Sequence, residues 1–211
     1  MPTTTEITEE YIRKHPSIQD CLKKGIINYS SLARRIAEDT EITKKSSIEA
    51  ILIAARRYAV KIKNEKINED AIIRLLKNAE LDVKTRSVVV VIDKDIYPDS
   101  LIDLEKDAKK NRDFIHIIEG VKTITILTTE RYLNKIKQKF SRSIIKEYSN
   151  LATLIIKTSH DIEAISGVMS YLYSLLGNRG INIIETMSCW TDTILVIDEK
   201  DVPSAMEVFR F

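Results

Sequence analysis

The side chains that most often carry chemistry are few in this sequence and lie far apart. The histidines and cysteines show none of the spacings that bring metal ligands together, or a nucleophile to its base. No glycine motif for phosphates or dinucleotides occurs, and no G-x-S-x-G motif. The sequence therefore predicts a protein that is not an enzyme and needs no cofactor or metal. The residues concerned are His15, His116, His160, Cys21 and Cys189.

Composition favours folded domains in the cytoplasm. A hydrophobic fraction of 44% is enough to form cores, and 30% charged residues suit a protein surrounded by water. The sequence shows neither a secretory signal nor an apolar stretch long enough for a membrane span, so we expect no membrane contact. Isoleucine accounts for 34 residues and glutamine for only two, a bias typical of thermophiles but also of AT-rich coding DNA.

Charge is distributed unevenly along the chain. Residues 1–80 carry 15 basic and 12 acidic side chains, whereas residues 151–211 carry 4 basic and 8 acidic ones. Neither segment is basic enough to require a nucleic-acid partner. The change of sign indicates that the last third of the chain faces different surroundings.

The first 80 residues show helical periodicity throughout. We expect Thr8 to cap the first helix, Asn28 or Ser30 the third, Ser46 or Ser47 the fourth and Asn68 the fifth. Gly25 should end the second helix. The fourth helix is apolar around much of its circumference, which predicts a central place in a small bundle. The expected helices span 9–14, 17–24, 30–39, 47–63 and 69–79.

A helix-turn-helix arrangement is one interpretation of these short helices. The segment 30–37 would be the positioning helix, and the segment 46–63 would enter the DNA major groove. Arg57 and Lys61 are four residues apart and share a helix face, where they could meet phosphates or base edges. Additional phosphate contacts would come from Arg34, Arg35, Lys44 and Lys45. The alternative is a plain helical bundle that dimerises or docks another protein.

Strand-like and helical segments alternate after residue 86. The first set has the order βαββαβ, and the second repeats it about 65 residues later but stops before a fourth strand. We expect residues 81–85 to be a connector, and the missing strand to come from 143–148 or from a partner chain. The predicted class is α+β, with a helical domain (1–80) and two ferredoxin-like modules (86–149 and 150–211). The first set comprises 87–93, 98–110, 114–118, 121–127, 130–140 and 143–148; the second comprises 151–156, a helix after Gly167, 181–187, 193–197 and 202–209.

The second module resembles the second ACT domain of aspartokinases. The matching stretches are LATLIIKTS from Leu151, SGVMSYLYSLLGNRGINIIETMS from Ser166, and TDTILVIDEKDVPSAMEVF from Thr191. The glycine before the helix (Gly167) and the Leu-Gly-x-x-Gly-Ile-Asn-Ile run ending at Ile183 carry the likeness. The first module is similar mainly in the order of its elements. No stretch resembles the catalytic domain of those kinases.

The resemblance implies a regulatory protein that dimerises through its ACT modules and holds an amino acid at an interface between domains. Backbone amides at a helix N-terminus would suit the ligand carboxylate, and Asp161 or Asn182 would receive its ammonium group. The family uses the loop before the first helix and the start of the second strand. By position these are Thr158, Ser159, His160, Asp161, Ser166, Gly167, Val168, Asn182 and Ile183.

The leading interpretation is thus a non-catalytic regulatory protein whose tandem ACT modules dimerise and could bind an amino acid. If the N-terminal helices bind DNA, the protein would be a transcription regulator that responds to this ligand. The alternative is a structural or adaptor protein, or a regulatory subunit of a separate enzyme, without a ligand. Trp190, in an expected hairpin turn, serves either as an interface anchor or as a cover for the sheet edge.

Overall fold

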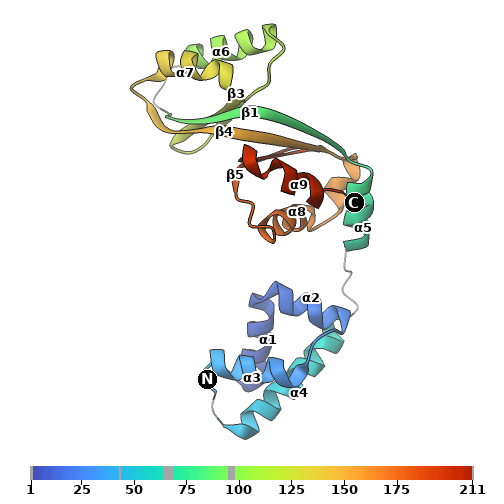
Figure 1. The fold of residues 1–211 in the computed structure, drawn as a ribbon. Helices are drawn as coiled ribbons and strands as arrows, with labels where there is room; N and C mark the ends of the chain where they lie inside the picture. Colours follow the sequence, from blue (N-terminus) through green and yellow to red (C-terminus); the bar gives the residue numbers. More distant parts are fainter. Residues whose placement is uncertain (1, 43, 64–68, 95–97, 211) are drawn as a thin grey trace. The chain divides into compact units, whose positions relative to one another are not determined.

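A computed structural model describes residues 2–42, 44–63, 69–94 and 98–210 of the chain. The chain divides into two compact units, Met1–Ile67, which is helical, and Asn68–Phe211, which contains the sheet (Figure 1). The expected α+β class, with helices first and two βαββαβ-like modules after them, is confirmed.

The described residues of the first unit form a bundle of four helices around one apolar core. Ile12, Ile36 and Ile51 are fully buried in it. Burial of each such side chain contributes about 1.5–3 kcal/mol. The longest helix, α4, contacts each of the other three, as its apolar circumference predicts. The bounds are α1, Thr4–Lys14; α2, Pro16–Lys24; α3, Tyr29–Asp39; and α4, Lys45–Ile62.

Two helices of this unit begin two or more residues before their expected starts. Helix α1 begins at Thr4, not Glu9, because Thr3 caps it: its hydroxyl accepts the Glu6 N–H (3.2 Å), and the Glu6 carboxylate accepts the Thr3 N–H (2.7 Å). Helix α4 begins at Lys45 without a side-chain cap, so Ser46 and Ser47 lie inside it. Asn28 caps α3 and Gly25 ends α2, as expected. The expected cap Asn68 lies outside the described residues.

The second unit is built on an antiparallel sheet of six strands in the order β2-β3-β1-β4-β6-β5. Apart from the two long strands β1 and β4, the helices and strands lie within a few residues of the expected bounds, and η marks a 3₁₀-helix. They are α5, Glu69–Lys77; β1, Glu80–Asp93; α6, Pro98–Lys110; β2, Ile115–Glu119; β3, Thr123–Thr129; η1, Glu130–Tyr132; α7, Leu133–Phe140; β4, Ile144–Lys157; η2, His160–Ala164; α8, Val168–Gly177; β5, Ile183–Cys189; β6, Asp192–Asp198; η3, Glu199–Asp201; and α9, Val202–Val208.

Strands β1 and β4 have 14 residues each, and both modules share them. They pair antiparallel along their whole length, from Glu80 opposite Lys157 to Ile92 opposite Ile144. The first module uses β2, β3, the second half of β1 and the first half of β4. The second module uses the first half of β1, the second half of β4, β6 and β5. Each long strand therefore ends one module and begins the other.

The strand missing from the second module is residues 80–84, so both expected sources were wrong. Leu81 lies opposite Ile156 and Val83 opposite Leu154, in the place that the fourth strand of the module should take. Residues 81–85 are therefore not a connector. Residues 143–148 belong to the first half of β4 and complete the first module instead.

The internal repeat is visible in the backbone of the long strands. Arg86 (φ 53°) and Asn150 (φ 56°) are 64 residues apart, and both adopt the left-handed conformation just before a run of buried residues. The register of the β1–β4 pair shifts around these positions, as at a β-bulge. Close to these positions the buried hydroxyl of Thr153 on β4 donates to that of Ser87 on β1 (2.9 Å), so side chains also join the two strands.

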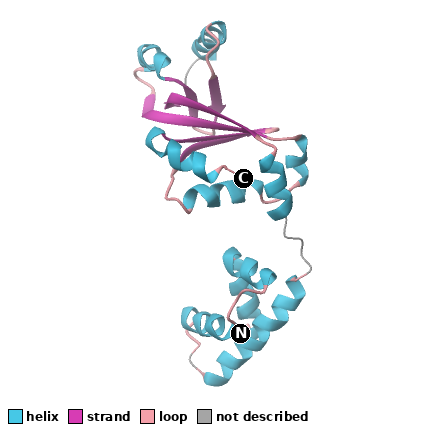
Figure 2. Ribbon diagram, turned by 45° about the vertical axis from the view of Figure 1, so that its right-hand side comes forward, coloured by secondary structure: helices cyan, strands magenta, loops and turns pink. Residues whose placement is uncertain are grey.

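Helices cover the two modules from opposite sides, with the strands between them (Figure 2). Helices α6 and α7 pack around Leu104 and Ile126, and helices α5, α8 and α9 pack around Leu154 and Leu172. A third apolar cluster is made by strand residues of both modules without a helix. Its buried members are Val89, Leu127, Leu151, Ile194 and Val196.

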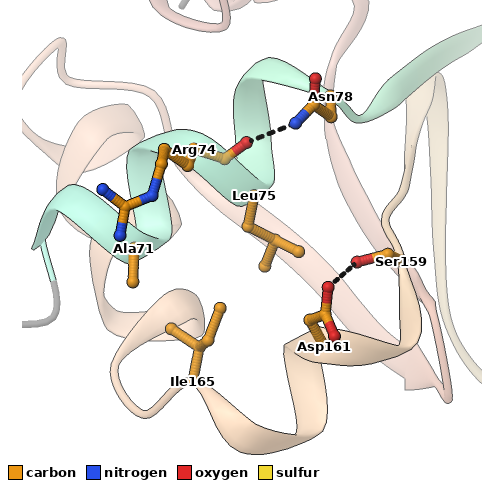
Figure 3. A pocket seen from close by; sticks show the side chains of 7 residues that line it. All are labelled: Ala71, Arg74, Leu75, Asn78, Ser159, Asp161 and Ile165. Atoms are coloured by element: carbon orange, nitrogen blue, oxygen red, sulfur yellow. Dashed lines mark hydrogen bonds between the residues drawn. The ribbon is translucent and has the colours of Figure 1, made fainter.

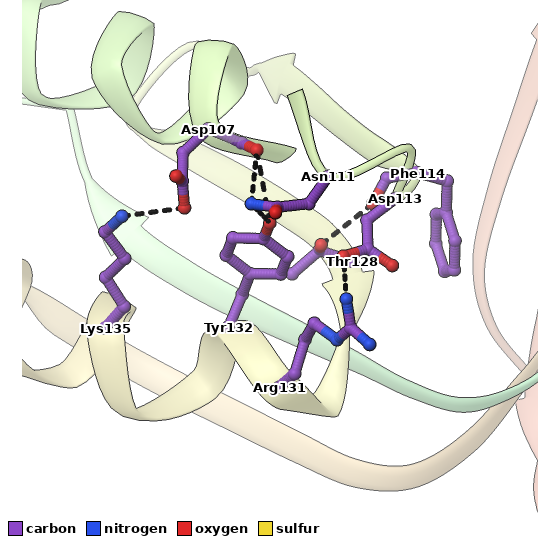
Figure 4. A network of polar contacts seen from close by, with 8 residues as sticks. All are labelled: Asp107, Asn111, Asp113, Phe114, Thr128, Arg131, Tyr132 and Lys135. Atoms are coloured by element: carbon purple, nitrogen blue, oxygen red, sulfur yellow. Dashed lines mark hydrogen bonds and ion pairs between the residues drawn. The ribbon is translucent and has the colours of Figure 1, made fainter. Parts of the chain in front are cut away.

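A polar network joins the two helices of the first module (Figure 4). The Asn111 amide on the turn after α6 donates to the Asp107 carbonyl (2.9 Å) and to the Tyr132 hydroxyl (3.2 Å). Lys135 of α7 pairs with the Asp107 carboxylate at 2.7 Å, and Arg131 pairs with Asp113 at 2.8 Å. Thr129 directly precedes η1, but its hydroxyl makes no capping bond.

Helix α5 belongs to the second unit, so the helical domain does not extend to residue 80 as expected. Ile72, Leu75 and Leu76 are buried in the core of the second module beside α8. The boundary between the compact units falls after Ile67. The sequence alone could not place it, because an amphipathic helix is equally suited to a bundle and to a sheet.

One ionisable group lies where the two modules meet. His116 on β2 is about half buried beside Phe114, with the ring centres 6.0 Å apart. Burial lowers the pKa of His116 below its ordinary value, and the Asp192 carboxylate on β6 opposes this shift. The neutral ring is therefore the form that the folded protein prefers.

This preference predicts a pH dependence of stability. Because the folded pKa is below the unfolded one, the contribution of His116 is fully present above about pH 6.5 and is lost as the pH falls towards the folded pKa. As the pH is lowered below about 6.5, we expect the free energy of unfolding to decrease more steeply in the native chain than in His116→Gln. Urea denaturation followed by Trp190, the single tryptophan, reports the second unit.

His160→Gln is the matched control, because His160 is exposed on η2 and should keep the native slope. An equal slope in His116→Gln and in the native chain would contradict the assignment.

Candidate ligand-binding site

The connection from β4 to α8 starts at an ion pair between the two long strands. Lys157, the last residue of β4, lies 2.7 Å from the Asp82 carboxylate on β1. The hydrogen bond and charge of Lys157 lower the pKa of Asp82, and Asp82 raises the pKa of Lys157 in return. The strand completing the second module therefore also fixes the point where the loop leaves the sheet.

Hydrogen bonds hold the first residues of the loop. The N–H and hydroxyl of Thr158 both donate to the Thr191 carbonyl, at 2.9 and 3.1 Å, which ties the loop to the β5–β6 hairpin. The Ser159 hydroxyl donates to the Asp161 carboxylate at 3.0 Å. Asp161 is exposed on η2, and its carboxylate is held by a neighbour rather than by an opposite charge.

Gly167 directly precedes helix α8, and its φ of 91° is strained for residues with a side chain. A Cβ at this position would lie 3.6 Å from Cδ1 of Ile72 on α5, so the two helices meet here. Val168 follows and is buried in the core, while Ile162 and Ile165 pack against the same core from the loop.

Two cavities lie on either side of η2. The first, of about 250 Å³, separates η2 from α5, and Figure 3 shows its walls. The second, of about 400 Å³, separates η2 and the start of α8 from the β5–β6 hairpin. The first is lined by Ala71, Arg74, Leu75, Asn78, Ser159, Asp161 and Ile165; the second by Ile162, Glu163, Ile165, Gly167, Val168, Met169, Ser170, Ser188 and Trp190.

The structure brings together the loop residues of the expected site but not the strand residues. Ser159 and Asp161 line the first cavity, whereas Gly167 and Val168 line the second. Asn182 and Ile183 follow the C-terminal end of α8, and a helix of ten residues is about 15 Å long. Asn182 and Ile183 line neither of the two cavities.

Three further loop residues play lesser parts. Thr158 serves the hairpin contact described above. His160 is exposed and lines neither cavity, and Ser166 is exposed just before Gly167.

Sequence reasoning missed the wall that α5 contributes to the first cavity. Three of the seven lining residues come from this helix, including Arg74, the positively charged group of the cavity, and a fourth, Asn78, directly follows it. The apolar stripe of α5 was visible in the sequence, but it does not show which core the helix joins.

Among the described residues, no group of three or more histidine, cysteine or acidic side chains could hold a metal ion. Cys21 and Cys189 are free thiols. The first cavity offers a small polar molecule a guanidinium from Arg74, a carboxylate from Asp161 and a hydroxyl from Ser159.

Acidic neighbours engage Arg35 and Lys61, two of the six basic residues expected to meet DNA. Arg35 Nε lies 3.0 Å from the Asp39 carboxylate, which also accepts the Tyr11 hydroxyl (2.6 Å). Tyr11 and then Arg35 lower the pKa of Asp39. Lys61 lies 3.6 Å from Glu9 of α1, and Arg34 approaches the Ser31 hydroxyl (3.4 Å). These contacts reduce the positive charge available to phosphates.

Arg57, one turn before Lys61, lies on the exposed face of α4. Ile53 and Val60 are seven residues apart on this face and are 50% and 74% exposed. With Arg57 between them they form an apolar stripe that carries an arginine, which we call the α4 stripe.

Known proteins show similarity to this chain in fold but not in sequence. No family model matches the chain, and no curated protein matches it. Of the helices in the described residues, none has the length and apolar character to cross a membrane.

Solved structures similar to the chain include three from aspartate kinases. Aspartate kinase from Clostridium acetobutylicum is 14% identical with a TM-score of 0.50, over 61% of this chain and 33% of that one. The regulatory subunit of aspartate kinase from Thermus thermophilus, in a ligand-free form, is 10% identical over 61% of this chain and 92% of its own, with a TM-score of 0.47. E. coli aspartokinase III, in complex with aspartate and ADP, is 9% identical over 61% of this chain and 32% of its own, with a TM-score of 0.48.

The chain thus matches about a third of the length of the Clostridium kinase. Identities this low concern the fold alone. The match to the Clostridium kinase, at a TM-score of 0.50, and the strand order show that the part of the chain carrying the sheet has a tandem ACT fold.

Proposed function

We propose that this chain is a non-catalytic regulatory protein that binds an amino acid beside η2, in the second ACT module. The observation that carries the proposal is the pair of cavities flanking η2, in the loop that the sequence resemblance selects. Asp161 is the group for the ligand ammonium, because its carboxylate opens on the first cavity and Ser159 holds it in place. A bound ligand would stabilise the second unit by mass action.

Thermal unfolding of the full chain in the presence of each of the twenty amino acids tests this function. At about ten times its dissociation constant, a ligand adds about 1.4 kcal/mol to the free energy of unfolding, which raises Tm by roughly 3–6 °C. We expect at least one amino acid to raise the Tm of the transition seen by Trp190 fluorescence. Asp161→Asn should abolish the rise.

Glu163→Gln is the matched control for that substitution. Glu163 is an exposed carboxylate on the same 3₁₀-helix, but it lines the second cavity. A loss of binding in Glu163→Gln with retention in Asp161→Asn would place the ligand in the second cavity. No rise of Tm with any amino acid at millimolar concentration would reject amino-acid binding.

We further propose that the chain acts as a homodimer assembled through its ACT modules. Strands β2 and β5 end the sheet on its two sides, and edge strands offer unpaired backbone groups to a second sheet. Ile115, Ile117 and Ile118 of β2 are only half buried. Sedimentation at micromolar concentration should give twice the mass of one chain, and a single-chain mass over the whole concentration range would contradict the dimer.

For the first unit, the α4 stripe favours the adaptor function over DNA binding. Exposed isoleucine and valine suit a protein partner, since DNA-binding surfaces are strongly charged and polar. The charge of Arg35 and Lys61 is already partly neutralised within the unit.

A titration with duplex DNA separates the two functions. DNA binding through several phosphates would weaken by orders of magnitude between about 50 and 200 mM salt. We expect no such steep dependence, and no difference between the native chain, Arg57→Ala and the control Arg13→Ala on α1. Steep salt dependence that Arg57→Ala reduces and Arg13→Ala does not would restore DNA binding.

A further inference from the structure

The cavity between α5 and η2 carries opposite charges on opposite walls. Figure 3 shows the Arg74 guanidinium on the α5 side and the Asp161 carboxylate on the η2 side, with Leu75 and Ile165 between them. A guanidinium is a strong partner for a carboxylate, and a carboxylate for an ammonium group. The free α-amino acid is the small-molecule class that presents both groups a few ångströms apart.

The space between the charged groups is apolar and small. Leu75 is 7% exposed and Ile165 is partly buried, so both offer side-chain carbons to the cavity. At about 250 Å³ the cavity is slightly below the size of sites for drug-sized ligands. An amino acid with a short aliphatic side chain fits these walls better than a long charged or aromatic one.

We propose that Arg74 binds the carboxylate of a small aliphatic amino acid whose ammonium group meets Asp161, so that α5 and η2 form one ligand clamp. This inference rests on the proposed function and assigns the ligand to the first of the two cavities. Arg74 then binds the ligand carboxylate in place of the backbone amides at the N-terminus of α8, because Gly167 and Val168 line the second cavity.

The clamp gives α5 a regulatory role. Ile72 and Leu76 anchor one face of α5 in the core, and Ile72 meets the start of α8 at Gly167. The other side of α5, with Ala71 and Arg74, faces η2 across the cavity. Helix α5 is also the first element of the second unit, and in sequence it follows α4 of the first. A ligand that joins Arg74 to Asp161 restrains the element through which the two units are connected along the chain.

Titration calorimetry on the full chain tests the clamp, with L-alanine, L-valine and L-leucine as probes. Arg74→Gln should weaken the binding of the best of these probes by about ten- to a hundredfold, the range for loss of a charge-assisted hydrogen bond. Lys77→Gln is the matched control, because Lys77 is an exposed cation on the same helix that does not line the cavity. It should leave the affinity unchanged.

Three outcomes would overturn the inference, and they are separable from failure of the proposed function. Equal affinity in Arg74→Gln and the native chain removes Arg74 from the site. Binding of other amino acids without any of the three probes refutes the ligand class. Equal weakening of 3-methylbutylamine, which lacks the carboxylate, and of L-leucine by Arg74→Gln shows a structural effect. Absence of binding by any amino acid rejects the proposed function itself.

Hydrogen exchange gives an independent reading of the clamp. At a saturating concentration of the best probe, amide exchange in residues 69–77 should slow in the native chain and in Lys77→Gln. Arg74→Gln at the same degree of saturation should lack this protection. Protection confined to residues 158–168 in the native chain would show that α5 is not part of the clamp.

Discussion

The pairing of β1 with β4 is the constraint on which the second unit depends. Each strand completes the sheet of one module and begins the sheet of the other, so neither module is whole without both strands. The left-handed residues Arg86 and Asn150 lie at the point where each strand passes from one module to the other. This conformation costs about 1–2 kcal/mol for most residues, and the buried ladder on either side of it offsets that cost.

Because of this sharing of strands, the two modules differ in the helices and strands that they contain. The second module draws α5 and the first half of β1 from chain that precedes the first module, so it cannot form until residues 69–84 and 151–208 meet. It therefore packs three helices against its sheet, whereas the first module packs two and joins them through Asn111 and Tyr132. The additional helix lies beside the loop that the ACT resemblance marks as the ligand site. The internal repeat is thus broken at the candidate site.

The sequence predicted the local elements well and their long-range assignment less well. Apolar runs such as 87–93 and 151–156 are strands by composition alone, and the repeat between them was visible. Residues 81–84 alternate between apolar and charged side chains, which is the pattern of a strand with one buried face, but the run is short and its partner lies more than 70 residues away. Pairing over that distance depends on the whole fold. For the same reason the sequence does not show which core α5 joins, because its apolar stripe fits more than one core.

The candidate site shows where positional transfer from a resemblance ends. Ser159 and Asp161 belong to one continuous loop, which the resemblance locates directly, and both line the first cavity. Asn182 was grouped with them by analogy, yet in this chain α8 separates it from the loop. Arg74 could not be found in this way, because it lies outside the aligned module and reaches the cavity only when α5 packs beside α8. A binding site is a property of the packed surface, and not of one stretch of sequence. Here α5, which packs on a core formed by residues far along the chain, supplies the cation Arg74 opposite the carboxylate of the loop.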